Sequence, residues 1–271
     1  MSSVALSAGV RQNLLSLQSI SQQLSTTQNH LATGKKVNSA LDNANEYFTA
    51  QSLNNRANSL STLLDGITNG INTIQAANNG ITSITKLVES AQSLATQAQQ
   101  TTDTNIRSSL ATQFGAIRTQ IDQLAGDAGF NGTNLLSGNS LTLTLNETGT
   151  STATVAGVTD TSAGLSIAAA TSSWAGATDI AAAATQLTAA LTTLQGQSVS
   201  LSSNLSTIQI RSDFTNATIN TLQTGAGQLV NADNNAEGAN LLALQTQQSL
   251  STTALSLSVQ SDRNVLKLFG G

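Results

Sequence analysis

The residue types that carry most enzyme chemistry are scarce in this chain. Its 271 residues contain no cysteine and one histidine, His30. A Ser-His-Asp triad or a zinc site would have to use His30, which has no acidic residue close to it in the sequence. The acids of the N-terminal half lack the regular spacing of a calcium-binding loop; they are Asp42, Glu46, Asp65, Glu89, Asp103, Asp122 and Asp127. We therefore expect no catalytic centre, no metal site and no cofactor.

The composition also narrows the classes of partner. Charged residues make up only 9% of the chain and the net charge is −4, which argues against nucleic acid and against anionic membranes as partners. No apolar run approaches the ~20 residues that cross a bilayer. Residues 1–31 lack the apolar core of a secretory signal. If the protein leaves the cell, we expect it to do so without a cleaved signal peptide.

The secondary structure is indicated by a seven-residue apolar repeat, which is typical of long helices packed side by side. The first row is Leu53, Leu60, Ile67, Ile74, Ile81 and Val88. The second row is Leu187, Leu194, Leu201, Ile208 and Leu222, with the polar Thr215 at the position between the last two. Because the rows match in period and are similar in length, we expect two long antiparallel helices in an elongated bundle. Glycines within the first row are expected to allow close packing against a neighbouring backbone; they are Gly66, Gly70 and Gly80.

Two thinner apolar stripes lie near the ends of the chain. The first is Val10, Leu14, Leu17, Leu24 and Leu31, and the second is Leu241, Leu244, Leu255, Val259 and Leu266. Glutamine and serine fill the other positions of these stripes, at Ser21, Gln28 and Gln248. Helices with so little apolar surface are marginal alone in water. We expect both ends to be disordered in the isolated monomer and to become helical when packed among other chains.

Turn signals separate these segments. Between Thr33 and Asp42 the helical pattern stops, and we expect Gly34 to end one helix and Asp42 or Asn43 to begin the next. A further amphipathic helix is predicted over 106–124. Leucines then alternate with polar residues at 141–145, and 152–158 follows as a second predicted strand. The sequence thus predicts a mainly helical protein with a small β-hairpin region.

The two ends of the chain resemble bacterial flagellin, the subunit of the flagellar filament. Residues 31–42 read LATGKKVNSALD, which is similar to the family's L-[ST]-[ST]-G-x-[KR]-[IV]-N-S-A-x-D. Near the C-terminus, Ala232-Asp233, Ala236-Glu237 and Asn240-Leu241 match, as does Val265-Leu266-Lys267-Leu268-Phe269. The Phe130-Asn131-Gly132 segment is similar to the place where the family's second helix gives way to strands.

The resemblance implies that both termini pair in an inner coiled-coil layer formed by residues 1–42 and 233–271, with the two terminal stripes packing within and between subunits. Residues 43–138 and 178–232 would form the helical core, and 139–177 a short variable insert. The linker between the layers would use Thr33, Gly34, Lys35, Asn38, Ser39 and Asp42. The implied function is structural: a homopolymer outside the cell, exported by the flagellar apparatus and assembled with cap and hook-associated proteins.

The chain also departs from the family pattern. Many flagellins are bound by Toll-like receptor 5 through an Arg-x-x-x-Leu patch on the first long helix. Here Leu94 is kept, Ser90 stands in the arginine position and Gln113 stands where a glutamate is usual. We therefore expect weak or absent recognition by this receptor.

Two other readings stay open at this point. The hook–filament junction protein has similar terminal helices and sits in few copies between hook and filament. From a different class, a coiled-coil adaptor or adhesin would bind partners through residues 139–178, although the linker motif argues against it.

Overall fold

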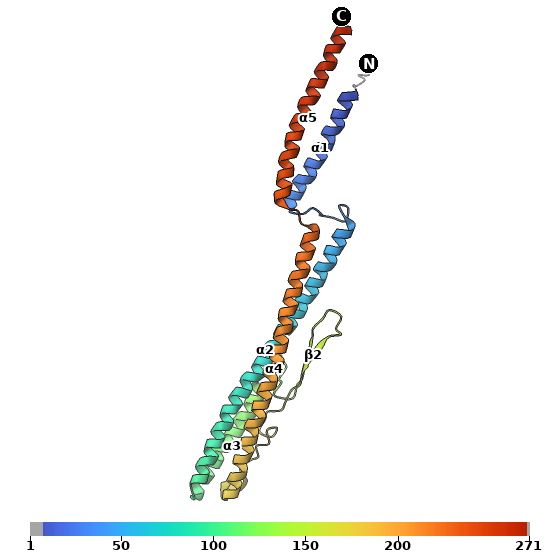
Figure 1. Ribbon diagram of the computed structural model, residues 1–271. Coiled ribbons are helices and arrows are strands. Elements are labelled where there is room, and N and C mark those ends of the chain that lie inside the picture. Colours follow the sequence, from blue (N-terminus) through green and yellow to red (C-terminus); the bar gives the residue numbers. More distant parts are fainter. Residues whose placement is uncertain (1–7, 270–271) are drawn as a thin grey trace. The chain divides into compact units, whose positions relative to one another are not determined.

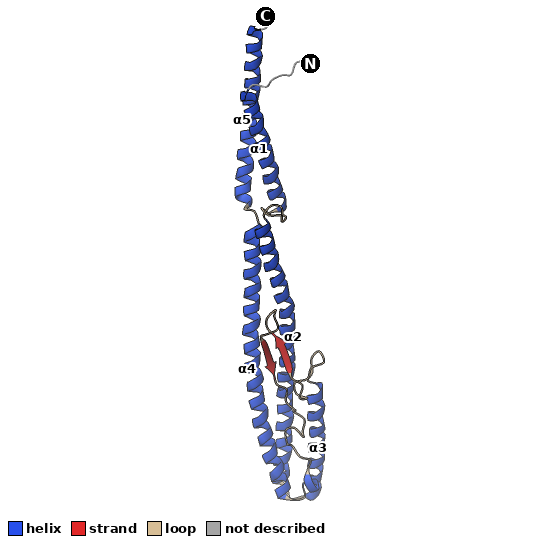
Figure 2. Ribbon diagram, turned by 90° about the vertical axis from the view of Figure 1, so that its right-hand side faces the viewer, coloured by secondary structure: helices blue, strands red, loops and turns tan. Residues whose placement is uncertain are grey.

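The computed structural model describes residues 8–269, with side chains as far as residue 264. Its elements are α1 (Ala8–Thr33), α2 (Ala44–Gln100), α3 (Thr104–Asp127), β1 (Leu141–Thr144), β2 (Thr152–Val155), the 3-10 turn η1 (Thr171–Trp174), α4 (Ala177–Val230) and α5 (Asn234–Phe269). The chain divides into two compact units, one of residues 1–55 with 222–271 and the other of residues 56–221. The prediction of a mainly helical fold with a small hairpin is confirmed (Figures 1 and 2).

The unit of residues 56–221 is a bundle in which α2 and α4 run antiparallel (Figure 2). The Gln92 amide donates to the Thr188 hydroxyl at 3.3 Å, and the Ser198 hydroxyl donates to the Asn78 amide oxygen at 3.0 Å. The heptad rows meet between these helices. Their buried members from the predicted core are Leu60, Ile67, Ile74, Ile81, Val88, Leu187, Leu194, Leu201 and Ile208.

Helix α3 completes the core of this bundle. It begins at an Asp103 cap, whose carboxylate accepts from the backbone N–H groups of Asn105 and Ile106. Phe114 is fully buried and its ring lies 4.9 Å from that of Trp174. The last carbonyls of α3 accept from the Asn134 amide, at 2.7 Å for Ala125 and 2.8 Å for Gly126. Without the hairpin region that follows α3, its C-terminus would lack these donors.

The strands β1 and β2 pair antiparallel, with Leu141 opposite Val155 and Thr144 opposite Thr152. The second strand ends at Val155, three residues earlier than predicted. The chain leaves the sheet there because Val158 N donates to the Leu135 carbonyl at 2.7 Å instead of to β1. At the tip, Arg56 of α2 binds Glu147 at 2.6 Å, which ties the hairpin to the bundle.

The glycines of α2 do not all act as predicted. An added Cβ at Gly70 would lie 2.6 Å from the Leu143 side chain, and one at Gly80 would lie 2.7 Å from Leu136. Close packing is therefore correct for these two, although the neighbours are side chains and not backbone. Gly66 faces open space, so the prediction was wrong there.

The turn η1 is left-handed. Ser172, Ser173 and Trp174 have φ of 48°, 51° and 57°, a region that costs L-residues roughly 1–2 kcal/mol each. Two features hold the turn in place: Trp174 is 1% exposed against Phe114, and the Arg107 guanidinium donates to the Ala175 carbonyl at 3.0 Å. Burial of the single tryptophan thus compensates for the strained backbone.

Among the helices of the described residues, none is long and apolar enough to cross a membrane.

Candidate assembly surface

The terminal helices α1 and α5 form an antiparallel pair (Figures 1 and 2). Near the linker, His30 Nδ1 lies 2.8 Å from the Glu237 carboxylate. Near the other end, the Asn13 amide donates to the Ser258 hydroxyl at 3.2 Å. These contacts fix the register of the pair by polar groups at both ends. No acidic residue is close to His30 in the sequence, and its acidic partner Glu237 comes from the other end of the chain.

Little of the surface between these helices is buried. On α1, Val10, Ile20 and Thr27 are buried. On α5, no residue whose side chain is described is buried. The predicted packing residues Leu17, Leu24, Leu31, Leu241, Leu244, Leu255 and Val259 are half-buried in the single chain, Leu14 is 39% exposed, and the side chain of Leu266 lies outside the described ones.

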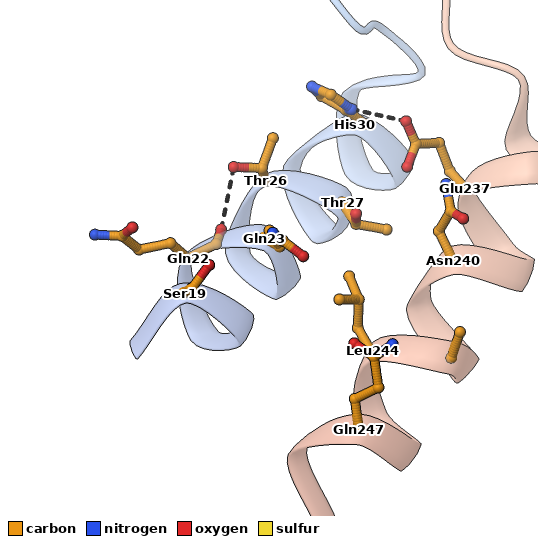
Figure 3. A pocket seen from close by; sticks show the side chains of 11 residues that line it. Ser19, Gln22, Gln23, Thr26, Thr27, His30, Glu237, Asn240, Leu244 and Gln247 are labelled. Atoms are coloured by element: carbon orange, nitrogen blue, oxygen red, sulfur yellow. Dashed lines mark hydrogen bonds and ion pairs between the residues drawn. The ribbon is translucent and has the colours of Figure 1, made fainter. Parts of the chain in front are cut away.

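A groove of ≈ 650 Å³ runs between α1 and α5 beside the His30–Glu237 pair (Figure 3). Thr27 and Leu244 point toward each other across the gap between the helices. The remaining lining is mostly polar and comes from Ser19, Gln22, Gln23, Thr26, Asn240, Ala243 and Gln247. A second groove, lined by Leu15, Ile20 and Leu250, shares Ser19, Gln23 and Gln247 with the first. The two grooves thus lie along one side of the helix pair.

Sequence analysis missed a set of exposed leucines on the terminal helices. Leu242, Leu250 and Leu257 of α5 are 66%, 65% and 65% exposed, and Leu15 of α1 is 60% exposed. On α5 their spacings of eight and seven residues keep them on the side opposite Leu241, Leu244 and Leu255. The available signal was a leucine next to a heptad position, as in Leu241–Leu242. Both terminal helices therefore carry leucine on two faces.

The linker after α1 is held by backbone hydrogen bonds. Gly34 has φ of 68° and ends α1 in the predicted left-handed conformation. The N–H groups of Lys36 and Val37 donate to the Val230 carbonyl at 2.8 and 3.2 Å, and the Ala232 N–H donates to the Gly34 carbonyl at 2.9 Å. The linker is thus pinned to the end of α4, and α5 starts directly after this contact.

Asp42 folds the linker onto itself. Its carboxylate accepts from the N–H groups of Asn38 and Ser39, each at 2.9 Å. These hydrogen bonds to Ser39 and Asn38 hold the pKa of Asp42 below its usual value. Asn43, and not Asp42, caps α2 by accepting from Glu46 N at 3.2 Å. The final aspartate of the linker motif therefore has a physical role, which is to hold the folded linker through these hydrogen bonds.

The other predicted residues have varied positions. Leu53 and Leu222 are half-buried, within the unit formed by the two chain ends. Ser90 and Gln113 are exposed, while Leu94 packs against the bundle core. Within the described part of the chain, no three His, Cys, Asp or Glu side chains are grouped as a metal site would require.

Known proteins with similar sequences indicate the family of this chain. Residues 7–141 match the family described as the bacterial flagellin N-terminal helical region. The chain is 31% identical to flagellin FljK and 33% identical to flagellin FljN, both of Caulobacter vibrioides, over 99% of each chain. It is 28% identical to a Brucella melitensis flagellin over 100% of both chains.

A crystal structure of Bacillus cereus flagellin aligns with 55% of this chain and 88% of its own, with a TM-score of 0.49 and 19% identity. The full-length similarity to the two Caulobacter flagellins decides the family. This chain belongs to the bacterial flagellins, the structural subunits of the flagellar filament.

Proposed function

We propose that the paired helices α1 and α5 are the main polymerisation surface of this flagellin, and that the leucines on their outer faces pack against neighbouring copies. The observation that carries this proposal is the two-sided leucine pattern of α5. Leu241, Leu244 and Leu255 face α1, whereas Leu250 and Leu257 are about two-thirds exposed. Because the filament is a homopolymer, the molecule that would cover these leucines is a second copy of this chain.

The energetics support assembly through these leucines. Full burial of one leucine contributes roughly 1.5–3 kcal/mol. Burying Leu15, Leu242, Leu250 and Leu257 would therefore offset a large part of the free-energy cost of ordering two helices. The groove between α1 and α5 adds serine, threonine, asparagine and glutamine groups that can hydrogen-bond to a neighbouring copy. Copies in contact would thus stabilise the helix pair as well as each other.

The linker would hold the helix pair α1–α5 in one orientation relative to the adjoining end of α4. Its predicted residues are Thr33, Gly34, Lys35, Asn38, Ser39 and Asp42. Support comes from the backbone bonds of Lys36 and Val37 to Val230 and from the Asp42 carboxylate. By family membership the subunit would be exported by the flagellar apparatus without a cleaved signal peptide. It would then assemble outside the cell between hook-associated and cap proteins.

The test is seeded polymerisation of the purified chain, followed by negative-stain electron microscopy and sedimentation. We expect long uniform filaments. A variant with Leu242, Leu250 and Leu257 all changed to Gln should raise the critical concentration at least about tenfold, since each lost burial is worth more than about 1.4 kcal/mol. Glutamine is as good a helix former as leucine.

The matched control changes the same three leucines to Met, which keeps apolar volume, and should polymerise nearly as the parent does. Normal filaments from the glutamine variant would overturn the proposal. A parent chain that stays monomeric with unfolded ends would favour the hook–filament junction reading. A monomer with folded ends would favour the adaptor reading.

The receptor prediction has its own support. Ser90 is exposed on α2 where the family's patch has an arginine, so a charged contact of that patch is missing. We propose weak or absent recognition by Toll-like receptor 5. A receptor reporter assay with pure monomer tests this, and strong activation at the level of an arginine-bearing flagellin would contradict it.

A further inference from the structure

Three buried oxygen atoms in the bundle have no hydrogen-bond partner. They are both carboxyl oxygens of Asp160 and the amide oxygen of Gln197. Asp160 is 0% exposed. Leaving such a group unsatisfied destabilises the folded state, and more strongly when the group is charged. The two side chains therefore require a physical explanation.

Asp160 lies in the loop after β2, which is anchored to Leu136 and to α3 and brings Asp160 beside Gln197 of α4. Its own N–H donates to the Leu136 carbonyl at 2.9 Å. Two residues later, Ser162 is anchored to α3, since its N–H donates to the Asp122 carboxylate at 2.6 Å. Farther along the loop, the Ile167 carbonyl accepts from the Arg118 guanidinium at 2.9 Å. The backbone thus holds the Asp160 side chain inside, and Gln197 is the group that α4 brings to it.

The charged residues that hold the neighbouring part of the loop are Arg118 and Asp122 of α3. Among the described residues, neither these two nor any other side chain hydrogen-bonds to an Asp160 oxygen. Burial raises the pKa of Asp160, and the nearby Gln197 amide only partly opposes that rise. The neutral acid is therefore the form that fits this site.

We propose that Asp160 is a protonated carboxylic acid paired with the Gln197 amide, and that this pair is a proton-operated latch holding the loop after β2 against α4. The acid O–H donates to Oε1 of Gln197, so one proton supplies the hydrogen bond that the carboxyl group and the Gln197 amide oxygen otherwise lack. No ion and no extra space are required.

The sign of the pH dependence follows from the raised pKa. The latch contributes its full stability below the ordinary Asp pKa of about 3.9. That contribution is lost as the pH rises through the raised pKa, because the proton leaves to solvent and a buried charge remains. The loop around Asp160 and Ser162 should then detach from α4. This inference concerns the bundle alone and does not rest on polymerisation through α1 and α5.

The decisive measurement is the titration of the Asp160 carboxyl by ¹³C NMR in the full chain, with hydrogen exchange of the loop amides followed over the same pH range. We expect Asp160 to titrate above the ordinary value and the loop amides to lose protection at the same midpoint. Titration at or below the ordinary value would overturn the proposal.

Two variants sharpen the test. Asp160→Asn keeps a neutral pair with Gln197, so its melting temperature should match the parent at acid pH and exceed it at alkaline pH. Asp122→Asn is the control, because it weakens the Ser162 anchor and should keep the parent's loss on the alkaline side. An Asp160→Asn protein that melts below the parent at neutral pH would contradict the latch. So would a calcium-dependent rise in the melting temperature of the parent that Asp160→Asn abolishes.

Discussion

The terminal helix pair and the central bundle both follow a seven-residue apolar repeat, yet they bury very different amounts of apolar surface. The connected core of buried residues lies wholly between Ile67 and Ile208. In the pair, α1 buries Val10, Ile20 and Thr27, and α5 buries none of its described side chains. The bundle therefore has a hydrophobic core of its own, whereas the pair leaves leucine side chains exposed.

This contrast predicts that the two regions of the chain differ in stability. The bundle has a third helix and the buried ring pair Phe114–Trp174. The pair has two helices and polar side-chain contacts such as that of His30 with Glu237. Because apolar burial is the dominant stabilising term, we expect the pair to unfold locally first. Hydrogen exchange should show fast exchange along α1 and α5 in the monomer and protection in the filament, and full protection in the monomer would contradict this.

The largest effect should come from removing the centre of the bundle. Phe114→Ala leaves a cavity beside Trp174 and should lower the free energy of unfolding of the bundle by about 3–5 kcal/mol. Urea unfolding followed by circular dichroism measures it. Ile106→Ala is the control on the same helix, since Ile106 is 50% exposed, and should cost well under half as much. Equal losses would mean that α3 is not anchored through its buried face.

A smaller effect is expected in the pair. His30→Ala removes the 2.8 Å contact to Glu237 and should destabilise the paired state by about 1–2 kcal/mol. Hydrogen exchange of α1 and α5 in the filament should accelerate accordingly, while the bundle amides should not change. Gln18→Ala, an exposed position of α1, should be nearly neutral. If the two variants behave alike, the contact of His30 with Glu237 contributes nothing to the pair.

The strained turn gives a prediction of opposite sign. Ser173→Gly removes the left-handed penalty at φ of 51° and should stabilise the bundle by up to about 1 kcal/mol. The same change at Ser203, which is exposed on α4, should destabilise it by about 0.5–1 kcal/mol. Thermal unfolding monitored by Trp174 fluorescence compares the two. Destabilisation by both variants would show that the turn is not strained.

The smallest effect on global stability is expected at Asp42. Since its folded pKa is lowered, its contribution is present above the ordinary value of about 3.9 and is lost as the pH falls through the folded pKa. The amides of Asn38 and Ser39 should then exchange faster in acid. Asp42→Asn should show fast exchange of these amides at neutral pH, with the bundle unchanged. Persistent protection in that variant would rule out the proposed role of the carboxylate.

Asp42 and Asp160 extend the comparison to electrostatics. The exposed Asp42 accepts backbone donors and favours its charged form, while the buried Asp160 lacks donors and favours its neutral form. The linker should therefore weaken in acid and the loop after β2 should weaken in alkali. The linker and the loop after β2 should respond to pH in opposite directions because the Asp42 carboxyl group is exposed and the Asp160 carboxyl group is buried.

The sequence by itself determined the elements that repeat with a fixed period or carry a local signal. The rows through Ile67 and Leu194 predicted the core of α2 and α4, because a seven-residue repeat places its members on one helix face. Gly34 ended α1 and the motif through Asp42 identified the family, since both act within a few residues. Alternation at 141–145 was enough to predict a strand.

Only the tertiary structure decided the contacts between distant segments. The contact of His30 with Glu237 and the position of Gln197 beside the buried Asp160 bring together residues that are far apart in the sequence. The exposed leucines were not predicted because a heptad pattern shows which helix face is apolar but does not show whether a second face also contacts a partner. The end of β2 likewise depended on the Leu135 carbonyl competing for Val158. Side-chain partners and strand ends depend on which groups meet in space, and the local chain does not encode that.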